Sequence, residues 1–142
     1  MTDCLKPEHL PSINKTVTHS QIRLYATASG DHNPIHLDEE FASNSHLGQI
    51  VAHGMLTLAF LSEMLTVAYG RSWIESGNMK VKFRRPAFPG EQLRTWGKVD
   101  SDEDQEHCRL IRCSIALLTC ENSEEVIAGT ATVRLPHDQE SV

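Results

Sequence analysis

Asp31 and His36 lie five positions apart in the segment SGDHNPIH, residues 29–36. Asn33-Pro34 between them is a turn signal, because proline disfavours helical geometry at the residue before it. The unperturbed pKa of histidine is near 6.5, and a nearby carboxylate can share the work of giving and taking protons. The pattern therefore predicts an acid–base pair across a turn, with the Asn33 amide group ordering that turn.

A second segment that could take part in catalysis is VAHGM, residues 51–55, at the predicted start of a long helix. The first amides of a helix have no partner within it and lie at the positive end of its dipole. Glycine also lets a ligand approach the backbone closely. We therefore expect the Gly54 amide to hold a carbonyl oxygen that gains negative charge, an interaction typically worth about 3 kcal/mol.

Other roles are open to these residues. Asp31 beside a glycine is also typical of a turn or capping residue, and His36 alone is typical of a hydrogen-bonded loop histidine. His53 is expected to pack or hydrogen-bond near the site, in a structural role. Asp31, His32, His36 and His53 form a ligand set that a divalent ion would accept, but the proline turn works against their convergence, so we predict no metal.

The elements that must position these residues follow from sequence periodicity. Residues 13–18 favour a short strand. Thr18 and Gln21 fit a capping box that begins a helix, and Gly30 is suited to end it. The loop 31–38 then leads into a short helix over Asp38–Ser43, with Asp38 as its cap. Residues 54–69 predict the one long helix, apolar nearly all round and hence buried on most sides, but too short for a membrane span.

The second half of the chain has residue patterns typical of β-strands. We expect them at residues 79–83, 91–100, 107–120 and 126–135, with the acidic stretch DSDEDQE, residues 100–106, as a solvated turn. Four sequential strands favour an antiparallel meander, which needs a cover for its apolar face. The predicted architecture is therefore α+β, with a curved sheet wrapped around the helix at 54–69.

Length and composition set the limits of this interpretation. The chain has 142 residues, which suits a single domain over 1–142, with a loose lead-in at 1–12 and a loose tail at 136–142. The net charge of −6 argues against nucleic acid as a partner. The four cysteines lack Cys-x-x-Cys spacing and the first residues lack an apolar stretch, so we expect reduced thiols and a cytoplasmic protein.

Three segments carry a resemblance to a known family: YATASGDHNPIHLDEEFA at 25–42, IVAHGMLTLAFLSEML at 50–65 and KVKFRRPAFPGEQL at 80–93. Over roughly residues 15–135 the chain resembles the MaoC-like (R)-specific enoyl-CoA hydratases. The resemblance implies a hot-dog fold, with Asp31 and His36 as the catalytic pair and the Gly54 amide as the oxyanion donor. It also implies that Asn33 supports the pair and that Ser62 lies near the active site.

The activity implied by this resemblance is reversible hydration of a trans-2-enoyl-CoA to an (R)-3-hydroxyacyl-CoA. No metal or redox cofactor is implied, because the chemistry is proton transfer beside an activated carbonyl. The acyl chain length, the direction of the reaction in the cell and the choice between coenzyme A and acyl carrier protein stay open.

A basic strip on this acidic chain suggests where such a substrate would bind. It consists of Lys80, Lys82, Arg84 and Arg85. A solvated strand face is the ordinary explanation, and contact of Arg84 or Arg85 with coenzyme A phosphates is the functional one. Met55 and Leu58 are core candidates that would also line an acyl pocket.

Two other functions compete with the hydratase. One is a hot-dog thioesterase, for which Glu63 on the long helix would be the candidate carboxylate. The other is a non-catalytic subunit that binds acyl thioesters, against which an intact Asp31/His36 pair argues. Free sheet edges also predict a homodimer or a dimer of dimers.

Overall fold

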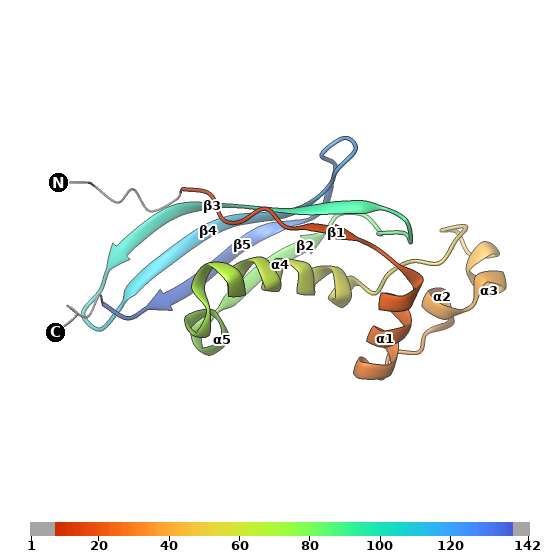
Figure 1. Cartoon of the computed structure of the whole chain (residues 1–142), viewed down its shortest axis with the longest axis horizontal. Helices are drawn as coiled ribbons and strands as arrows, with labels where there is room; N and C mark the ends of the chain where they lie inside the picture. The colour runs from red at the N-terminus through yellow and green to blue at the C-terminus, as the bar shows by residue number, and fades with distance from the viewer. Residues whose placement is uncertain (1–7, 138–142) are drawn as a thin grey trace.

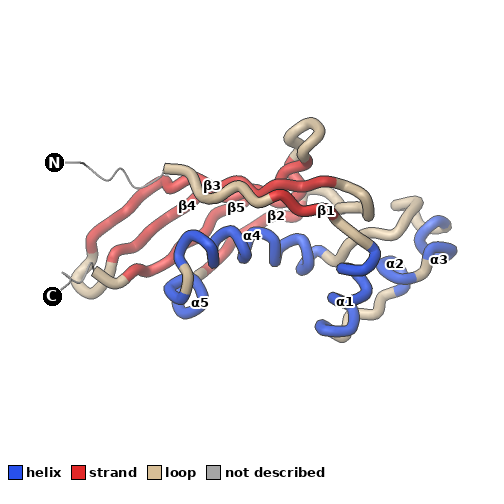
Figure 2. The backbone as a smooth tube through the Cα atoms, viewed as in Figure 1, coloured by secondary structure: helices blue, strands red, loops and turns tan. Residues whose placement is uncertain are grey.

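A curved five-stranded antiparallel sheet dominates the computed structural model, which describes residues 8–137. The long helix α4 (Gly54–Tyr69) lies along the sheet, and three short helices gather beyond one end of it (Figure 1). Figure 2 shows the same separation, with the strands on one side of α4 and the early helices away from the sheet. The strands are β1 (Asn14–Thr16), β2 (Asn78–Phe83), β3 (Gln92–Asp104), β4 (Arg109–Thr119) and β5 (Glu125–Leu135).

The predicted sheet topology was correct only in part. Strands β3, β4 and β5 form an antiparallel meander, but the sheet order is β1-β3-β4-β5-β2, so β2 pairs with β5 instead of β3. The far edge of β3 is taken by β1, through Asn14 opposite Arg94. Gly129 of β5 allows the backbone of β2 to approach closely, because a Cβ at this position would lie 2.0 Å from the Lys80 carbonyl oxygen.

The predicted turn at 100–106 was wrong, because β3 continues through Asp104. Its acidic side chains are accommodated on the surface of the hairpin with β4. Arg109 forms an ion pair with Asp102, and the Ser114 hydroxyl donates to Asp100 at 2.6 Å. Partners on the neighbouring strand thus override the turn preference of an acidic stretch.

The helices that precede α4 begin with α1 (His19–Ser29). Its predicted capping box is present, with reciprocal bonds of 3.1 Å between Thr18 and Gln21. Gly30 ends the helix at a φ of 78°, as glycine allows. The loop predicted after Gly30 contains one unexpected turn of helix, α2 (Pro34–Leu37), before α3 (Glu39–Ser43). Proline at a first helical position favours that turn. The short helix α5 (Arg71–Ser76) was also not predicted.

The described part of the lead-in is anchored to the sheet. The Leu10 amide donates to the Gly97 carbonyl at 2.9 Å, and the Val99 amide donates to Glu8 at 2.8 Å. Leu10 is buried where Gly97 lacks a side chain. Residues 8–12 are therefore not loose. Residues 1–7 and 138–142, and with them Cys4 and most of the predicted tail, lie outside the described residues.

The core forms where one side of α4 meets the sheet. Leu61, Met64 and Leu65 are fully buried against inward residues of β3, β4 and β5. Residues 8–137 leave the opposite side of α4 uncovered, since Met55 and Val67 are 58% and 63% exposed. The prediction of a helix buried on most sides was thus wrong for the single chain. Between residues 8 and 137, no helix is long and apolar enough to cross a membrane.

Candidate active site

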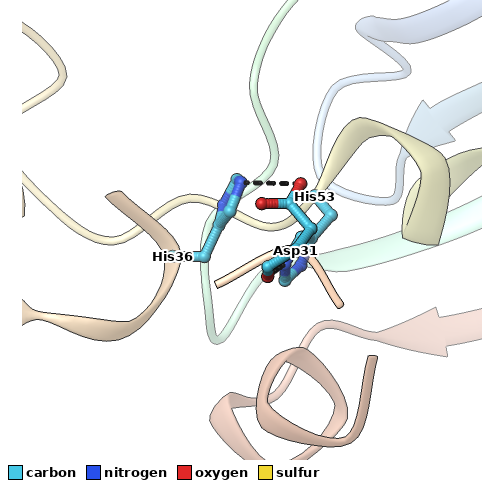
Figure 3. A group of neighbouring side chains, drawn as sticks. All are labelled: Asp31, His36 and His53. Carbon is cyan, nitrogen blue, oxygen red and sulfur yellow. Dashed lines mark hydrogen bonds and ion pairs between the residues drawn. The ribbon is translucent and has the colours of Figure 1, made fainter. Parts of the chain in front are cut away.

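The fold brings Asp31, just after α1, to His36 in α2. The His36 Nε2 atom lies 4.0 Å from Asp31 Oδ2 (Figure 3). On the other side of the ring, Nδ1 lies 2.7 Å from the Val51 carbonyl oxygen. A carbonyl only accepts, so His36 donates from Nδ1 and turns Nε2 toward the carboxylate. Nε2 and Oδ2 are therefore the atoms free for proton transfer.

Local hydrogen bonds shape the turn that carries Asp31. The Asp31 amide donates to the Ser29 hydroxyl at 3.1 Å, and the Asn33 amide donates to Asp31 Oδ1 at 3.2 Å. The Asn33 side chain in turn accepts from the Ile35 amide at 3.1 Å and caps α2. One carboxylate oxygen of Asp31 thus holds the turn, and the other faces His36. Asn33 lies where the sequence placed it, as the residue that orders the turn.

His53 completes the cluster from the residue before α4. It is 2% exposed, and its Nε2 atom lies 3.0 Å from the Asp31 carbonyl oxygen. Its ring stacks on that of His36, with centroids 3.8 Å apart and planes inclined by 27°. Sequence reasoning expected His53 near the site but had no signal for this stacking, which depends on how α2 packs against residues 51–53.

The same geometry bears on the metal alternative. One potential ligand atom each from Asp31, His36 and His53 lie within 4.8 Å of one another, whereas His32 is exposed and does not join them. Imidazole nitrogens bind metals in the plane of the ring. The stacked rings lie in planes inclined by only 27°, which is an unfavourable geometry for two in-plane ligand atoms that would bind one ion. The arrangement suits proton transfer better than metal binding.

Gly54 begins α4 with its amide available. The first backbone bonds of the helix run from Leu56 and Thr57 to the His53 carbonyl, at 3.0 and 3.2 Å. Among the described residues the Gly54 amide makes no hydrogen bond, and a Cβ there would lie 3.2 Å from the Phe83 ring. A depression of about 340 Å³ adjoins it, lined by Gly54, Phe83, Arg84 and Ala87 among others. Gly54 itself is exposed beside this depression.

The two predicted phosphate ligands have different surroundings. The Arg85 guanidinium forms two hydrogen bonds with Glu91, at 2.9 and 2.5 Å, and its Nε lies 3.3 Å from Glu124. Burial raises the pKa of Glu91, but bonds from Arg85 and the Phe88 amide outweigh that effect and hold the pKa below its usual range. Arg84 is 54% exposed at the mouth of the depression. Arg84 is thus more available to a ligand than Arg85.

The remaining predicted site residues lie along α4. Ser62 accepts a hydrogen bond of 3.1 Å from the Trp73 indole, and its place near the active site stays a prediction. Eight residues of helix separate it from Gly54, about 12 Å along the axis. Met55 is exposed beside Gly54, whereas Leu58 is half-buried against the core.

With this geometry in hand, comparison with known proteins defines the family. The model of the "MaoC like domain" matches residues 5–117. The chain therefore belongs to the MaoC-like domain family, as the sequence motifs predicted.

Two curated relatives have informative names. The chain is 29% identical to an "(R)-specific enoyl-CoA hydratase" of Rhodospirillum rubrum over 134 residues, 93% of this chain and 89% of that protein. It is 37% identical to "3-hydroxyacyl-thioester dehydratase Z" of Mycobacterium tuberculosis over 93 residues, 63% of this chain and 62% of that protein. Both names describe hydro-lyases, the enzyme class predicted from the sequence.

The fold comparison agrees. The R-hydratase PhaJ1 of Pseudomonas aeruginosa superimposes with a TM-score of 0.80 at 23% identity, covering 97% of this chain and 86% of that one. The (R)-hydratase of A. caviae gives a TM-score of 0.77 at 22% identity, covering 94% and 99%. At these identities the likeness concerns the fold, and it confirms the predicted hot-dog architecture.

Proposed function

We propose that this protein hydrates trans-2-enoyl-CoA thioesters to (R)-3-hydroxyacyl-CoA, and catalyses the reverse dehydration, through Asp31 and His36. The observation that carries the proposal is the facing of His36 Nε2 and Asp31 Oδ2 across 4.0 Å, with Nδ1 of the same ring engaged by Val51. A gap of that width suits two groups that share one water molecule.

The reaction follows from these two atoms. A water bound to Asp31 Oδ2 and His36 Nε2 adds its oxygen to the β-carbon of the enoyl group while one of the pair, most simply Asp31, accepts its proton. A proton then passes from the pair to the α-carbon, so that water is added across the double bond. His36 can gain and lose a proton at Nε2 without giving up its bond to Val51. The pair ends the cycle as it began.

The Gly54 amide supports the same reaction at the thioester. As the β-carbon is attacked, negative charge moves onto the thioester oxygen. The amide lies at the positive end of α4 and has no partner among the described residues, so it is suited to receive that oxygen. The adjoining depression would take the thioester past Phe83 toward Arg84, with Met55 exposed near the acyl group.

The thioesterase alternative has less support. Its candidate carboxylate, Glu63, lies on α4 nine residues after Gly54 and is paired with Lys15 at 2.6 Å. That ion pair occupies the carboxylate that a hydrolytic reaction would need. A non-catalytic binding role leaves the facing of Asp31 and His36 unexplained.

The exposed side of α4 and the free edge of β2 support a homodimer as part of the proposal. Apolar residues such as Met55 and Val67 are costly to leave in water. Light scattering that returns a monomer would contradict the dimer. The absence of a cofactor and the cytoplasmic location stay predictions.

The reaction type is tested by following two signals with crotonyl-CoA. Loss of the enoyl-thioester absorbance without release of free thiol is the result expected for a hydratase. Release of thiol from saturated acyl-CoA at a comparable rate would instead identify a thioesterase. Tight binding with neither signal, for crotonyl-CoA and for longer enoyl-CoAs, would identify a binding subunit.

A further inference from the structure

We propose that His53 is a positioning residue that holds Asp31 and His36 in their reactive arrangement. The inference rests on the proposed hydratase function and adds a third residue to its machinery. His53 is suited to this role because it contacts both members of the pair through different parts of one buried ring (Figure 3).

The first contact fixes the Asp31 backbone. The His53 ring donates from Nε2 to the Asp31 carbonyl at 3.0 Å, across 22 positions of sequence. Within residues 31–33, the other hydrogen bonds of the described structure are local, to Ser29, Ile35 and His36. The bond from His53 is therefore what ties this exposed turn to the buried start of α4.

The second contact fixes the His36 ring. Its face stacks on His53 at 3.8 Å, and its Nδ1 is held by Val51, two residues before His53. A face and an edge of His36 are thus both held by the segment 51–53. Tyr25 of α1 packs against His53 in turn, with ring centroids 4.7 Å apart. The support reaches from α1 through His53 to the reacting ring.

The remaining nitrogen of His53 indicates that this ring is a support instead of a second base. With Nε2 donating, the neutral ring carries no proton on Nδ1. Nδ1 is buried and has no hydrogen-bond partner among the described residues. The contacts of the ring with the pair are therefore its Nε2 hydrogen bond to Asp31 and its face against His36.

Two substitutions separate the two contacts. His53→Phe keeps an aromatic ring beneath His36 but removes the donor to Asp31. His53→Gln keeps a donor at the position of Nε2 but removes the ring. Misplacement of reacting groups by 1 Å can cost about 10²-fold in rate. We expect His53→Phe to lower kcat with crotonyl-CoA by about that factor, and His53→Gln by about tenfold, with KM changed by less than about threefold.

The matched control is His32→Phe. His32 is exposed in the same turn, and no contact with the pair involves it. This variant should keep the wild-type kcat. A loss in His32→Phe equal to that in His53→Phe would overturn the proposal, as would a rise in KM with kcat unchanged in the His53 variants, since that pattern belongs to a substrate-binding residue.

A double-mutant cycle tests whether His53 acts through the pair. Once Asp31→Asn has removed the carboxylate, adding His53→Phe should lower the remaining kcat by less than about threefold, because coupled residues are not additive. A full second loss in that background would show that His53 acts independently, and would contradict the proposal.

Hydrogen exchange provides a measurement that needs no activity. The amides of Asn33 and His36 donate within the turn at 3.2 and 3.0 Å. We expect them to exchange faster in His53→Phe than in wild type or His32→Phe, while amides of β4 stay unchanged. If wild type hydrates no enoyl-CoA, the proposed function fails, and this exchange result alone decides the role of His53. Unchanged exchange in the turn would overturn the inference in either case.

Discussion

Two pairs in this molecule, each made of a carboxylate and a basic side chain, differ in how closely their members meet. Arg85 and Glu91 meet through two hydrogen bonds of 2.9 and 2.5 Å, and Glu91 also accepts from the Phe88 amide at 2.8 Å. Asp31 and His36 face each other across 4.0 Å, and the Asp31 side chain is 52% exposed. Arg85 and Glu91 are in direct contact, so no molecule fits between them. Asp31 Oδ2 and His36 Nε2 are separated by a gap that a small molecule such as water can occupy.

The difference indicates which pair serves the fold and which serves chemistry. Glu91 bonds both to Arg85 and to the Phe88 amide and so holds the turn at 86–90, which indicates a role in stability. Asp31 and His36 are each secured from behind, by Asn33 and Val51, which keeps the facing atoms apart.

Removal of the imidazole should have the largest effect on catalysis. A general acid–base group typically contributes roughly 10²–10⁴-fold. His36→Ala should therefore lower kcat for crotonyl-CoA hydration by about that range, with the unfolding temperature close to wild type. His32→Ala is the matched control and should retain full activity. Wild-type activity in His36→Ala would show that the Asp31–His36 pair has a structural role and no catalytic one.

The Gly54 amide can be removed with little disturbance of the backbone. Proline is tolerated at a first helical position, and His53 has a φ of −57° and a ψ of 134°, as a residue before proline requires. Gly54→Pro should lower kcat about 10²–10³-fold by deleting the oxyanion donor.

Gly54→Ala keeps the amide and serves as its control. Both variants place a Cβ about as close to Phe83, 3.2 Å in the present geometry. Equal losses of kcat in the two variants would assign the effect to packing against Phe83 and remove the amide from the mechanism.

Disruption of the Arg85–Glu91 pair should lower the stability of the protein but not its catalytic rate. Glu91→Gln weakens two bonds to Arg85 and should lower the free energy of unfolding at pH 7 by about 1–3 kcal/mol, with kcat nearly unchanged. Urea denaturation of both proteins measures this difference. A wild-type stability at pH 7 would show that the pair is energetically neutral.

The same variant predicts a pH dependence. In the folded protein the pKa of Glu91 lies below its usual value, because Arg85 and the Phe88 amide bond to the carboxylate. Its contribution is therefore complete above the unfolded-state pKa and is lost as the pH falls through the lower folded-state pKa. The stability difference between wild type and Glu91→Gln should be constant near neutral pH and shrink below about pH 4. A difference that grows in acid would contradict this assignment.

The smallest effect is expected at the mouth of the depression. Arg84 is exposed and only loosely paired, at 3.7 Å from Glu125. Arg84→Ala should raise KM for crotonyl-CoA by up to about fivefold and leave kcat unchanged, since an exposed ion pair is worth about 0–1 kcal/mol. The loss should fade at high salt. Steady-state kinetics at two salt concentrations measure the change in KM. An unchanged KM at low salt would show that Arg84 is only a solvated surface residue with no part in substrate binding.

Much of the fold was predictable because its signals are local. The capping box at Thr18, the stop at Gly30 and the start of α4 at Gly54 depend on residues within a few positions, and the structure has all three. The sheet order was not predictable in the same way. The pairing of β2 with β5 depends on which edges are free and on close approach at Gly129, a contact between distant residues.

The candidate site shows the same limit. Motif spacing identified Asp31, His36 and Gly54, which lie at the ends of neighbouring elements. It offered Arg84 or Arg85 as a contact for phosphates without distinguishing them, because an arginine's partner, here Glu91 for Arg85, cannot be read from the arginine itself. It also gave no signal for the stacking of His53 on His36, since ring contacts depend on tertiary packing.

The most direct test of the contrast between the two pairs is one assay applied to two matched variants. Asp31→Asn and Glu91→Gln each replace a carboxylate by its amide, and the rate of loss of crotonyl-CoA absorbance is compared with wild type at pH 7. We predict that Asp31→Asn loses roughly 10²–10⁴-fold in kcat, whereas Glu91→Gln stays near the wild-type rate. Wild-type activity in Asp31→Asn would contradict the proposed mechanism, because the Asp31–His36 pair would then have no part in the chemistry.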